Sequence, residues 1–210
     1  MKQKKTGDSG VDHDEQFIQR LKAHDKTAYR ELVERYQTRI YNLGLKMLIN
    51  REDAEDILQE TFIQVFKKID NFREESELST WIYRIATNAA LMKLRERKRH
   101  QNRLTELEDA HMVPVVPSSL TGNGKTPFEE LINKESRVVL DKAIAELPDI
   151  YRVVFVLKDI ERMATQDISE MLELSHEAIY SRLKRARIQL RNSIIKAYQE
   201  QQEGNRHAMS

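Results

Sequence analysis

The sequence has no cysteine and is poor in glycine and proline, and each shortage excludes a class of protein. A chain without cysteine has neither a disulfide framework nor a thiolate metal site. Of its six glycines, none lies between Gly44 and Gly122 or between Gly124 and Gly204, so neither stretch holds a glycine-rich phosphate loop or a dinucleotide-binding fingerprint. The four prolines are confined to one central stretch. Because these two residues are the ones that interrupt helices, the composition indicates an all-α protein.

Long apolar runs and metal-ligand patterns are missing as well. The longest apolar run, residues 153–157, is far too short to cross a membrane, and no apolar signal core follows the basic segment 1–5. We therefore expect a cytoplasmic protein with no membrane insertion. The histidines are scattered, and none stands at metal-ligand spacing from another, so we expect no metal, no cofactor and no catalytic residue. They are His13, His24, His100, His111, His176 and His207.

Charge is nearly balanced over the whole chain but strongly segregated along it. The formal net charge is +1, yet residues 52–60 carry acids without a base, and residues 182–191 carry bases without an acid. Residues 93–99 are almost as basic. Blocks of opposite sign on one chain suggest several partners of different charge, one of them nucleic acid.

Hydrophobic periodicity divides the chain into two helical lobes. The stripe of an amphipathic helix recurs three times in the first lobe, residues 15–100, which follows a disordered N-terminal tail, 1–14. Between residues 53 and 69 it consists of Ala54, Ile57, Leu58, Phe62, Val65, Phe66 and Ile69. An earlier stripe includes Leu32, Val33, Tyr36, Ile40, Leu43 and Met47, and a later one Trp81, Ile82, Ile85, Ala89 and Met92.

Periodicity disappears over residues 101–136, which hold three of the four prolines and a Gly-Asn-Gly turn. This segment is mildly acidic, and we expect a flexible linker that does not hold the two lobes in position. The second lobe covers residues 137–197 and precedes a C-terminal tail, 198–210. Its first stripe ends at a proline and consists of Val138, Val139, Ala143, Ile144 and Leu147. The predicted fold is two small helical domains joined by that linker.

Residues 165–187 have the pattern of a helix-turn-helix. Two short helical stretches are separated by a break at residues 173–175, with Ser175 placed to cap the second helix. A buried stripe in the second helix consists of Ile179, Leu183, Ala186 and Leu190. Such a helix enters the major groove of DNA, where arginine pairs with guanine and lysine neutralises phosphates. The alternative is a helical hairpin whose basic face is merely solvated, and the turn is imperfect because Glu173 stands where glycine is usual.

At these positions the chain resembles a known family. The run LPDIYRVVFVLKDIERMATQDISEMLELSHEAIYSRLKRAR (147–187) resembles region 4 of bacterial RNA polymerase sigma factors. The runs DAEDILQETF (53–62) and TWIYRIATNAALMKLRERKR (80–99) resemble region 2. Two regions in this order, joined without a region 3 domain, are typical of the extracytoplasmic-function (ECF) subgroup. The resemblance implies a subunit that binds core RNA polymerase and directs initiation at promoters with minus-10 and minus-35 elements, usually restrained by an anti-sigma factor.

The resemblance also implies three sets of site residues. Core polymerase would dock on the outward face of the helix 53–69, at Asp53, Asp56, Gln59, Glu60 and Ile63. The minus-10 element would contact Arg84, Asn88, Lys93, Arg95, Arg97 and Arg99. The minus-35 element would contact His176, Tyr180, Ser181, Lys184, Arg185 and Arg187. Trp81 fits either the core or a base-stacking surface, and its spacing from Ile85 favours the core.

Departures from the family and other functions also need to be weighed. Acids at Glu74, Glu75 and Glu77 stand in the loop to which the resemblance assigns selection of the minus-10 sequence, where they would repel a DNA strand. The runner-up function is a free-standing DNA-binding regulator whose first lobe serves dimerisation. The first lobe argues against it, because a dimerisation module has no reason to carry both an acidic face and a basic helix. An enzyme is a distant third.

Overall fold

The computed structural model describes residues 11–105 and 134–208 of the chain, with side chains described over 14–100 and 136–200. Every regular element in these ranges is helical, as predicted. Residues 1–10 of the predicted tail and most of the predicted linker lie outside the described residues. The helix bounds differ from the predicted boundaries: the first helix starts at Val11, the fourth runs on to Thr105, and the last continues through most of the predicted C-terminal tail to Ala208.

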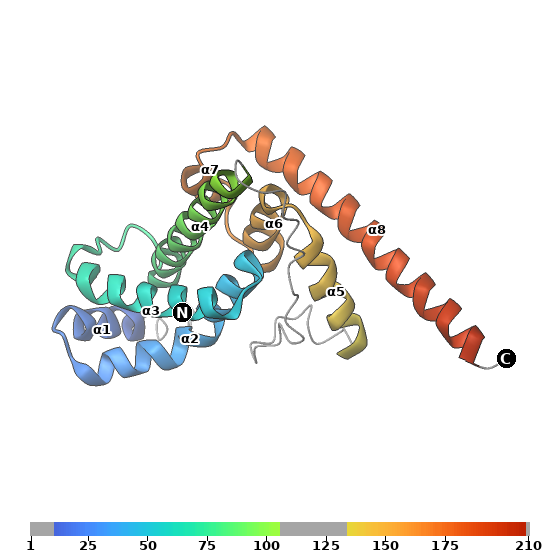
Figure 1. Cartoon of the computed structure of the whole chain (residues 1–210). Coiled ribbons are helices and arrows are strands. Elements are labelled where there is room, and N and C mark those ends of the chain that lie inside the picture. The colour runs from blue at the N-terminus through green and yellow to red at the C-terminus, as the bar shows by residue number, and fades with distance from the viewer. Residues whose placement is uncertain (1–10, 106–133, 209–210) are drawn as a thin grey trace, which may run out of the picture.

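The first lobe consists of α1 (Val11–Lys22), α2 (Lys26–Leu48), α3 (Arg51–Lys68), the 3-10 turn η1 (Ile69–Asn71) and α4 (Leu78–Thr105) (Figure 1). Asparagine and aspartate set the starts of two of these helices. The Asp25 carboxylate accepts the backbone N–H of Thr27, and the Asn50 side chain accepts that of Asp53 at 2.9 Å. Hydrogen bonds from the Thr27 hydroxyl and its backbone N–H lower the pKa of Asp25 to about 2, so this cap stays charged at neutral pH.

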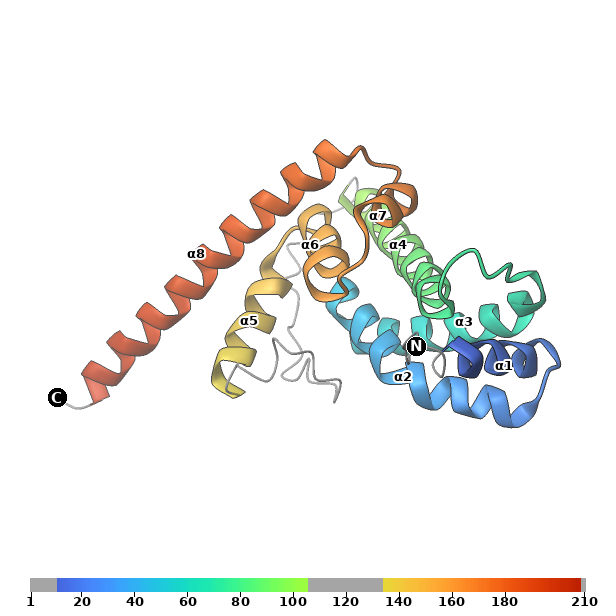
Figure 2. The ribbon, with the colours of Figure 1, turned by 180° about the vertical axis from the view of Figure 1, so that it is seen from behind.

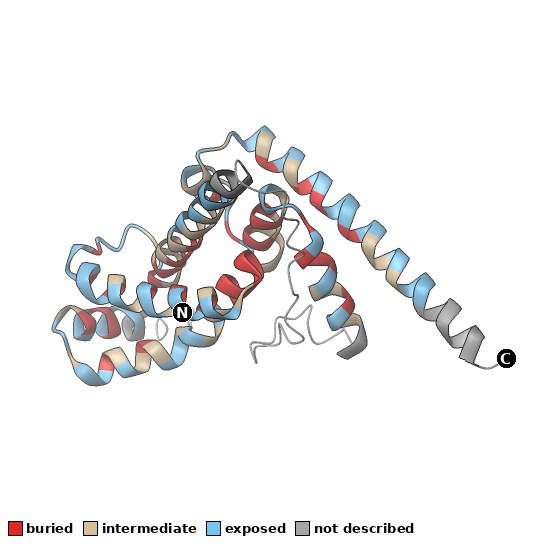
Figure 3. Cartoon of the chain, viewed as in Figure 1, coloured by how far each residue is buried: buried red, intermediate tan, exposed pale blue. Residues whose placement is uncertain are grey.

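The second lobe consists of α5 (Lys134–Glu146), α6 (Asp149–Phe155), the π-helical turn η2 (Val156–Ile160), α7 (Thr165–Leu172) and α8 (His176–Ala208). Pro148 separates α5 from α6, as the stripe that ends before it predicts. Helices α5 and α6 pack along α8, whose C-terminal half extends away from the rest of the molecule (Figures 1 and 2). Figure 3 shows the buried residues on the inner sides of these three helices.

Three of the predicted stripes are slightly too wide. Phe66, Met92 and Val138 were expected in the core, but they are 52%, 60% and 59% exposed. In each case a neighbour in the sequence takes the inward position instead, namely Val65, Leu91 and Val139. Consecutive residues of a helix point about 100° apart, so only one of each pair faces the helices that cover it.

The two lobes pack against each other through their own helices, a contact that the sequence did not predict. One cluster of buried apolar residues runs from Phe17 in α1 to Leu190 in α8. Helix α2 contacts α5, α6 and η2, and α4 contacts α7. The junction between the lobes therefore buries apolar surface and is more than a tether.

Arg152 of α6 is the polar centre of this junction. Its guanidinium is buried and donates to the carbonyl oxygens of Ala145 (3.1 Å) and Leu147 (2.7 Å) at the end of α5. It also donates to Met47 O (3.2 Å) in the last turn of α2 and pairs with Asp149. Burial lowers the pKa of Arg152, but its partners are all acceptors and the group stays charged. One side chain thus satisfies the ends of two helices from different lobes.

We predict that Arg152→Met lowers the free energy of unfolding by about 3 kcal/mol or more, because methionine fills the space but leaves buried carbonyls unpaired. Urea unfolding followed by circular dichroism measures the change. Arg191→Met, at an exposed position of α8, is the matched control. A loss below about 1 kcal/mol at position 152 would show that these carbonyls find other donors.

Candidate nucleic-acid interface

The helix-turn-helix predicted from the sequence is present as α7, a three-residue turn and α8. Glu173 adopts a left-handed backbone conformation (φ 53°, ψ 44°) and its N–H bonds to Ser169 O. This is the conformation that glycine takes most easily, which is why glycine is usual at this position and Glu173 is a departure. The Ser169 hydroxyl donates to Leu174 O at 2.6 Å, and the Ser175 hydroxyl accepts the Ala178 N–H at 3.2 Å. The predicted cap at Ser175 is confirmed, and the turn is held without glycine.

The recognition helix buries the predicted stripe, Ile179, Leu183, Ala186 and Leu190. The six side chains predicted for the minus-35 element are all exposed. Two arginines among them also contact the lobe itself: Arg187 makes a bidentate pair with Asp159 (2.8 Å for both bonds), and Arg185 donates to the Tyr151 hydroxyl at 3.3 Å. Ser181 and Lys184 are exposed on the side of α8 that faces away from the buried stripe.

The side chains predicted for the minus-10 element fall into two groups. Asn88, Arg95 and Arg99 are exposed along α4. Arg84, Lys93 and Arg97 are held by acceptors within the chain. Lys93 lies 3.2 Å from Asp53 and 3.1 Å from Asp56, while Arg97 pairs with Asp53 and donates to Leu48 O at 2.7 Å.

Arg84 joins the two lobes. It pairs with Asp167 and, at 3.1 Å, with Glu170, both on α7. Two carboxylates of the helix-turn-helix thus occupy the guanidinium that was predicted to hold a DNA backbone. Because phosphates and carboxylates compete for the same donors, the pairing and the predicted DNA contact exclude one another.

The acidic face of α3 is smaller than predicted. The Asp53 side chain is 15% exposed and lies between α3 and α4, so its outward placement is wrong. The reason is the two cations of α4 that surround it. Asp56, Gln59 and Glu60 are exposed, and Ile63 is 46% exposed among them. These four residues form the α3 face.

Helix α4 and the residues near it hold one feature that the sequence predicted and others that it did not. Trp81 is half-buried against Phe72, with ring centroids 5.1 Å apart, which agrees with the preference for a core position. Burial, together with the charge of Glu161, raises the pKa of Tyr83. Four buried side-chain atoms of the described residues have no hydrogen-bond partner: Asn42 Oδ1, Tyr83 OH, Arg84 Nε and Thr87 Oγ1. Three of these atoms belong to residues 83–87 of α4, so this part of the helix buries polar atoms that lack hydrogen-bond partners.

The described residues hold no cluster of three histidine, cysteine, aspartate or glutamate side chains that would bind a metal ion. None of the described helices is long and apolar enough to cross a membrane.

Comparison with known proteins defines the class of the molecule. Residues 32–100 match the Sigma-70 region 2 family, and residues 137–190 match the Sigma-70, region 4 family. These segments cover α2 to α4 in one lobe and α5 to the first half of α8 in the other. The chain therefore combines the two regions that define sigma factors of this type.

Whole-chain relatives narrow the class to the ECF group. The chain is 33% identical over 177 residues to the ECF RNA polymerase sigma factor SigW of Bacillus subtilis, covering 84% of this chain and 94% of that protein. It is 32% identical over 182 residues to the ECF RNA polymerase sigma-E factor of Haemophilus influenzae, covering 86% and 95%. The chain belongs to the ECF RNA polymerase sigma factor family. As such it acts in transcription initiation through core polymerase binding and promoter recognition, and it is not an enzyme.

Two solved structures share the fold. One is CnrH in complex with the cytosolic domain of CnrY (TM-score 0.55, 22% identity, 88% of this chain and 97% of that chain). The other is the sigma factor RpoE in complex with the anti-sigma factor NepR from Bartonella quintana (TM-score 0.58, 19% identity, 79% and 96%). At this identity the likeness concerns the arrangement of helices. Family membership decides against the free-standing regulator considered from the sequence.

Proposed function

We propose that this sigma factor reads the minus-10 element with α4 and the minus-35 element with the start of α8, while the α3 face docks on core polymerase. The observation that carries the proposal is that each lobe presents exposed polar and basic side chains on the helix that its sigma-70 region contributes. Asn88, Arg95 and Arg99 supply them on α4, and Ser181 and Lys184 supply them on α8. Phosphate contacts position a protein on DNA, and base-edge contacts select the sequence.

The α3 face supports polymerase docking because it combines charge with apolar surface. Asp56 and Glu60 precede Ile63 by about two turns and one turn of α3 and are exposed, as Ile63 is. Ile63 is 46% exposed, whereas several other apolar residues of α3 are buried. Acids around an exposed apolar side chain are the composition of an interface rather than of a solvated face. Asp53 contributes indirectly, since its pairs with Lys93 and Arg97 fix α3 onto α4.

Replacing Asp56 and Glu60 together by lysine should weaken association with core polymerase about tenfold or more, because two attractive charges become repulsive. Fluorescence anisotropy of the labelled chain titrated with core enzyme measures this. Glu34→Lys combined with Glu146→Lys makes the same charge change at exposed positions elsewhere and should leave association unchanged. Equal weakening by both pairs would mean that overall charge, not the α3 face, governs docking.

Within the recognition helix, Arg185 and Lys184 should behave differently. Arg185 lies one helical turn beyond Ser181 and is steered by the Tyr151 hydroxyl, so its guanidinium is held in a defined place from which it can pair with a base edge. Lys184 is an exposed point charge suited to a phosphate.

We expect Arg185→Ala to cost about 1–3 kcal/mol of binding free energy at one base pair of the minus-35 element, and Lys184→Ala to weaken all sequences alike. Holoenzyme binding to a promoter set with single substitutions in that element measures both. Arg191→Ala serves as the control, because Arg191 is exposed on α8 beyond the residues predicted to contact the minus-35 element. A uniform loss for Arg185→Ala would reassign it to the DNA backbone.

The packing of the lobes suggests how DNA access is controlled. Arg84 cannot contact the minus-10 strand while Asp167 and Glu170 hold it, so promoter binding requires the lobes to separate. We call the structure with the two lobes packed together the closed arrangement. The unpartnered polar atoms on α4 reduce its stability. We interpret the closed arrangement as the state of the chain before it binds polymerase. Contacts between polymerase and both lobes would then offset the free energy needed to separate them.

Asp167→Asn combined with Glu170→Gln should raise the affinity of the free chain for single-stranded DNA, by about threefold to tenfold at low salt, because the competing carboxylates become neutral. Anisotropy with a labelled random-sequence 12-mer measures the change. Glu146→Gln combined with Glu173→Gln removes the same charge away from Arg84. If that control gains as much affinity, net charge and not the release of Arg84 accounts for the effect.

The remaining partners follow from family and fold. A solved structure of the same fold is a sigma factor bound to an anti-sigma factor, and we infer that an anti-sigma factor also restrains this chain. Because its target is RNA polymerase, we place its action in the cytoplasm. Exposed apolar side chains remain on α5 and α8 after the lobes pack, including Val138, Ile188 and Ile195, and they give such a partner apolar surface to cover.

A further inference from the structure

The corner between α1 and α2, residues 22–26, contacts the loop that leads into α4, residues 72–77, and the turn η1 just before it. Lys22 Nζ lies 2.7 Å from a carboxylate oxygen of Glu74 and 6.0 Å from the centroid of the Phe72 ring. His24 Nε2 lies 3.3 Å from Asp70 in η1, just before the loop. Two residues of the loop and one residue of η1 therefore meet two side chains from one corner. This corner lies outside the segment that matches Sigma-70 region 2, which begins at residue 32.

The ends of the loop are fixed by burial. Phe72 is 4% exposed and packs against Trp81 with its ring tilted by 41°, and Leu78 is 8% exposed at the start of α4. Between these anchors, Arg73, Glu74, Glu75 and Glu77 are all exposed. The interior of the protein therefore positions the two ends, and contacts made at the surface decide the path of the residues between them.

The middle of the loop has an unfavourable backbone that needs such a contact. Glu74 has φ 61°, in the left-handed region that a residue with a side chain adopts less readily than glycine. The ion pair with Lys22 holds this residue in place. The Lys22 and Glu74 side chains are 25% and 38% exposed, so the pair is partly shielded from water.

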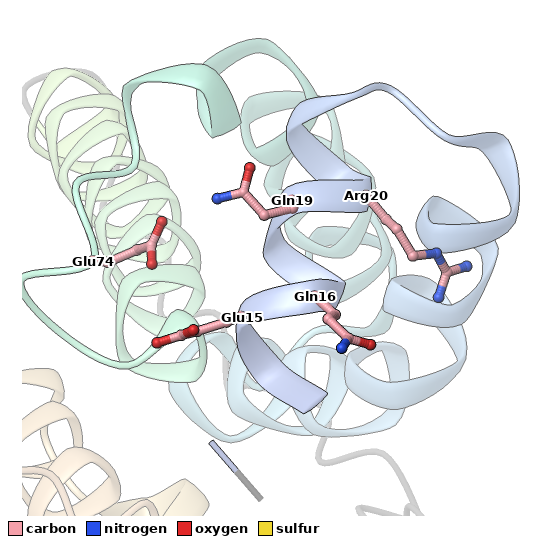
Figure 4. Close-up of a pocket in the computed structure, with 5 residues that line it drawn as sticks. All are labelled: Glu15, Gln16, Gln19, Arg20 and Glu74. Carbon is pink, nitrogen blue, oxygen red and sulfur yellow. The ribbon is translucent and has the colours of Figure 1, made fainter. Parts of the chain in front are cut away.

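The support from α1 is local to Lys22. A hollow of about 610 Å³ is lined by Glu74 and by Glu15, Gln16, Gln19 and Arg20 of α1. In Figure 4, Glu15 and Gln19 lie on the side of α1 that faces Glu74, whereas Gln16 and Arg20 point to its other side. Because this hollow separates the preceding turns of α1 from the loop, they do not fill the space behind Glu74. Loss of Lys22 would remove the ion pair that holds the middle of the loop against α1.

We propose that Lys22 is a positioning residue for promoter selectivity, which holds the loop 72–77 in the path that presents it beside the minus-10 strand. The proposal rests on the proposed reading of the minus-10 element by α4, to which the resemblance to sigma region 2 adds the loop that leads into this helix. Lys22 acts in two ways: it fixes the path of the loop, and it neutralises one of three acids that would otherwise repel the DNA. A loop free to move presents several paths to the same strand and discriminates less between bases.

The test uses holoenzyme and a promoter library randomised in the minus-10 element, with open-complex formation read by sequencing. Lys22→Ala should reduce the ratio between preferred and disfavoured sequences by about fivefold or more, while the minus-35 preference and core association stay unchanged. Lys22→Arg should keep the wild-type ranking. Lys22→Glu should be worse than Lys22→Ala, and adding Glu74→Lys should restore selectivity. Lys26→Ala removes a neighbouring exposed lysine and should change nothing.

Each outcome has a distinct meaning. An unchanged minus-10 ranking for Lys22→Ala, in a library where replacing residues 73–77 by Gly-Ser changes the ranking, would overturn the role of Lys22 and leave the proposed function intact. If the Gly-Ser loop also leaves the ranking unchanged, the loop does not read this element and the proposed function fails there. A uniform loss at both promoter elements with Lys22→Ala would point to general destabilisation and would also overturn the proposal.

Discussion

The arrangement of this sigma factor depends on one buried guanidinium. Arg152 reaches carbonyl oxygens at the ends of α5 and α2, two helices that belong to different lobes. Helix ends leave carbonyls that no later residue of the helix can satisfy, and burying them unpaired is expensive. A short side chain with one donor would satisfy one of them. Arginine has five donors in a rigid fork, so it satisfies several at once and fixes the angle between the helices that supply them.

A second constraint is that the basic groups of this chain serve two sets of partners. Arg84, Lys93 and Arg97 are paired with carboxylates inside the chain, yet they lie on α4, the helix proposed to read the minus-10 element. This matches the near-zero net charge, which results from segregated blocks of opposite sign. Internal pairing keeps the charges compensated until DNA is present, and the exchange of carboxylate for phosphate changes little in the local electrostatics. At Arg84, the one of these three that pairs with the other lobe, separation with phosphate taking the place of the carboxylates therefore requires less energy than leaving the guanidinium unpaired would.

The sequence predicted the local features well and the contacts between distant residues poorly. Helical stripes, the cap at Ser175 and the special backbone at Glu173 all depend on residues within a few positions of each other. The Arg152–Met47 bond joins residues 105 positions apart, and the Arg84–Asp167 pair joins residues 83 positions apart. A single arginine in an apolar stretch does not reveal which carbonyls it will meet. The same limit explains the error at Asp53, which is outward on an isolated helix but covered once α4 packs beside it.

The continuous last helix has a mechanical consequence. Helix α8 has 33 residues and begins at the recognition turn, so at 1.5 Å per residue it is a rod about 50 Å long. A rod without a hinge transmits the tilt of one end to the other. With its first turns in a DNA groove, as proposed, the direction of the distant end is fixed as well, roughly 35–40 Å beyond the groove. Any molecule that meets that end encounters it in one orientation on promoter DNA, and the lever arm magnifies small changes of angle at the groove into displacements of several ångströms.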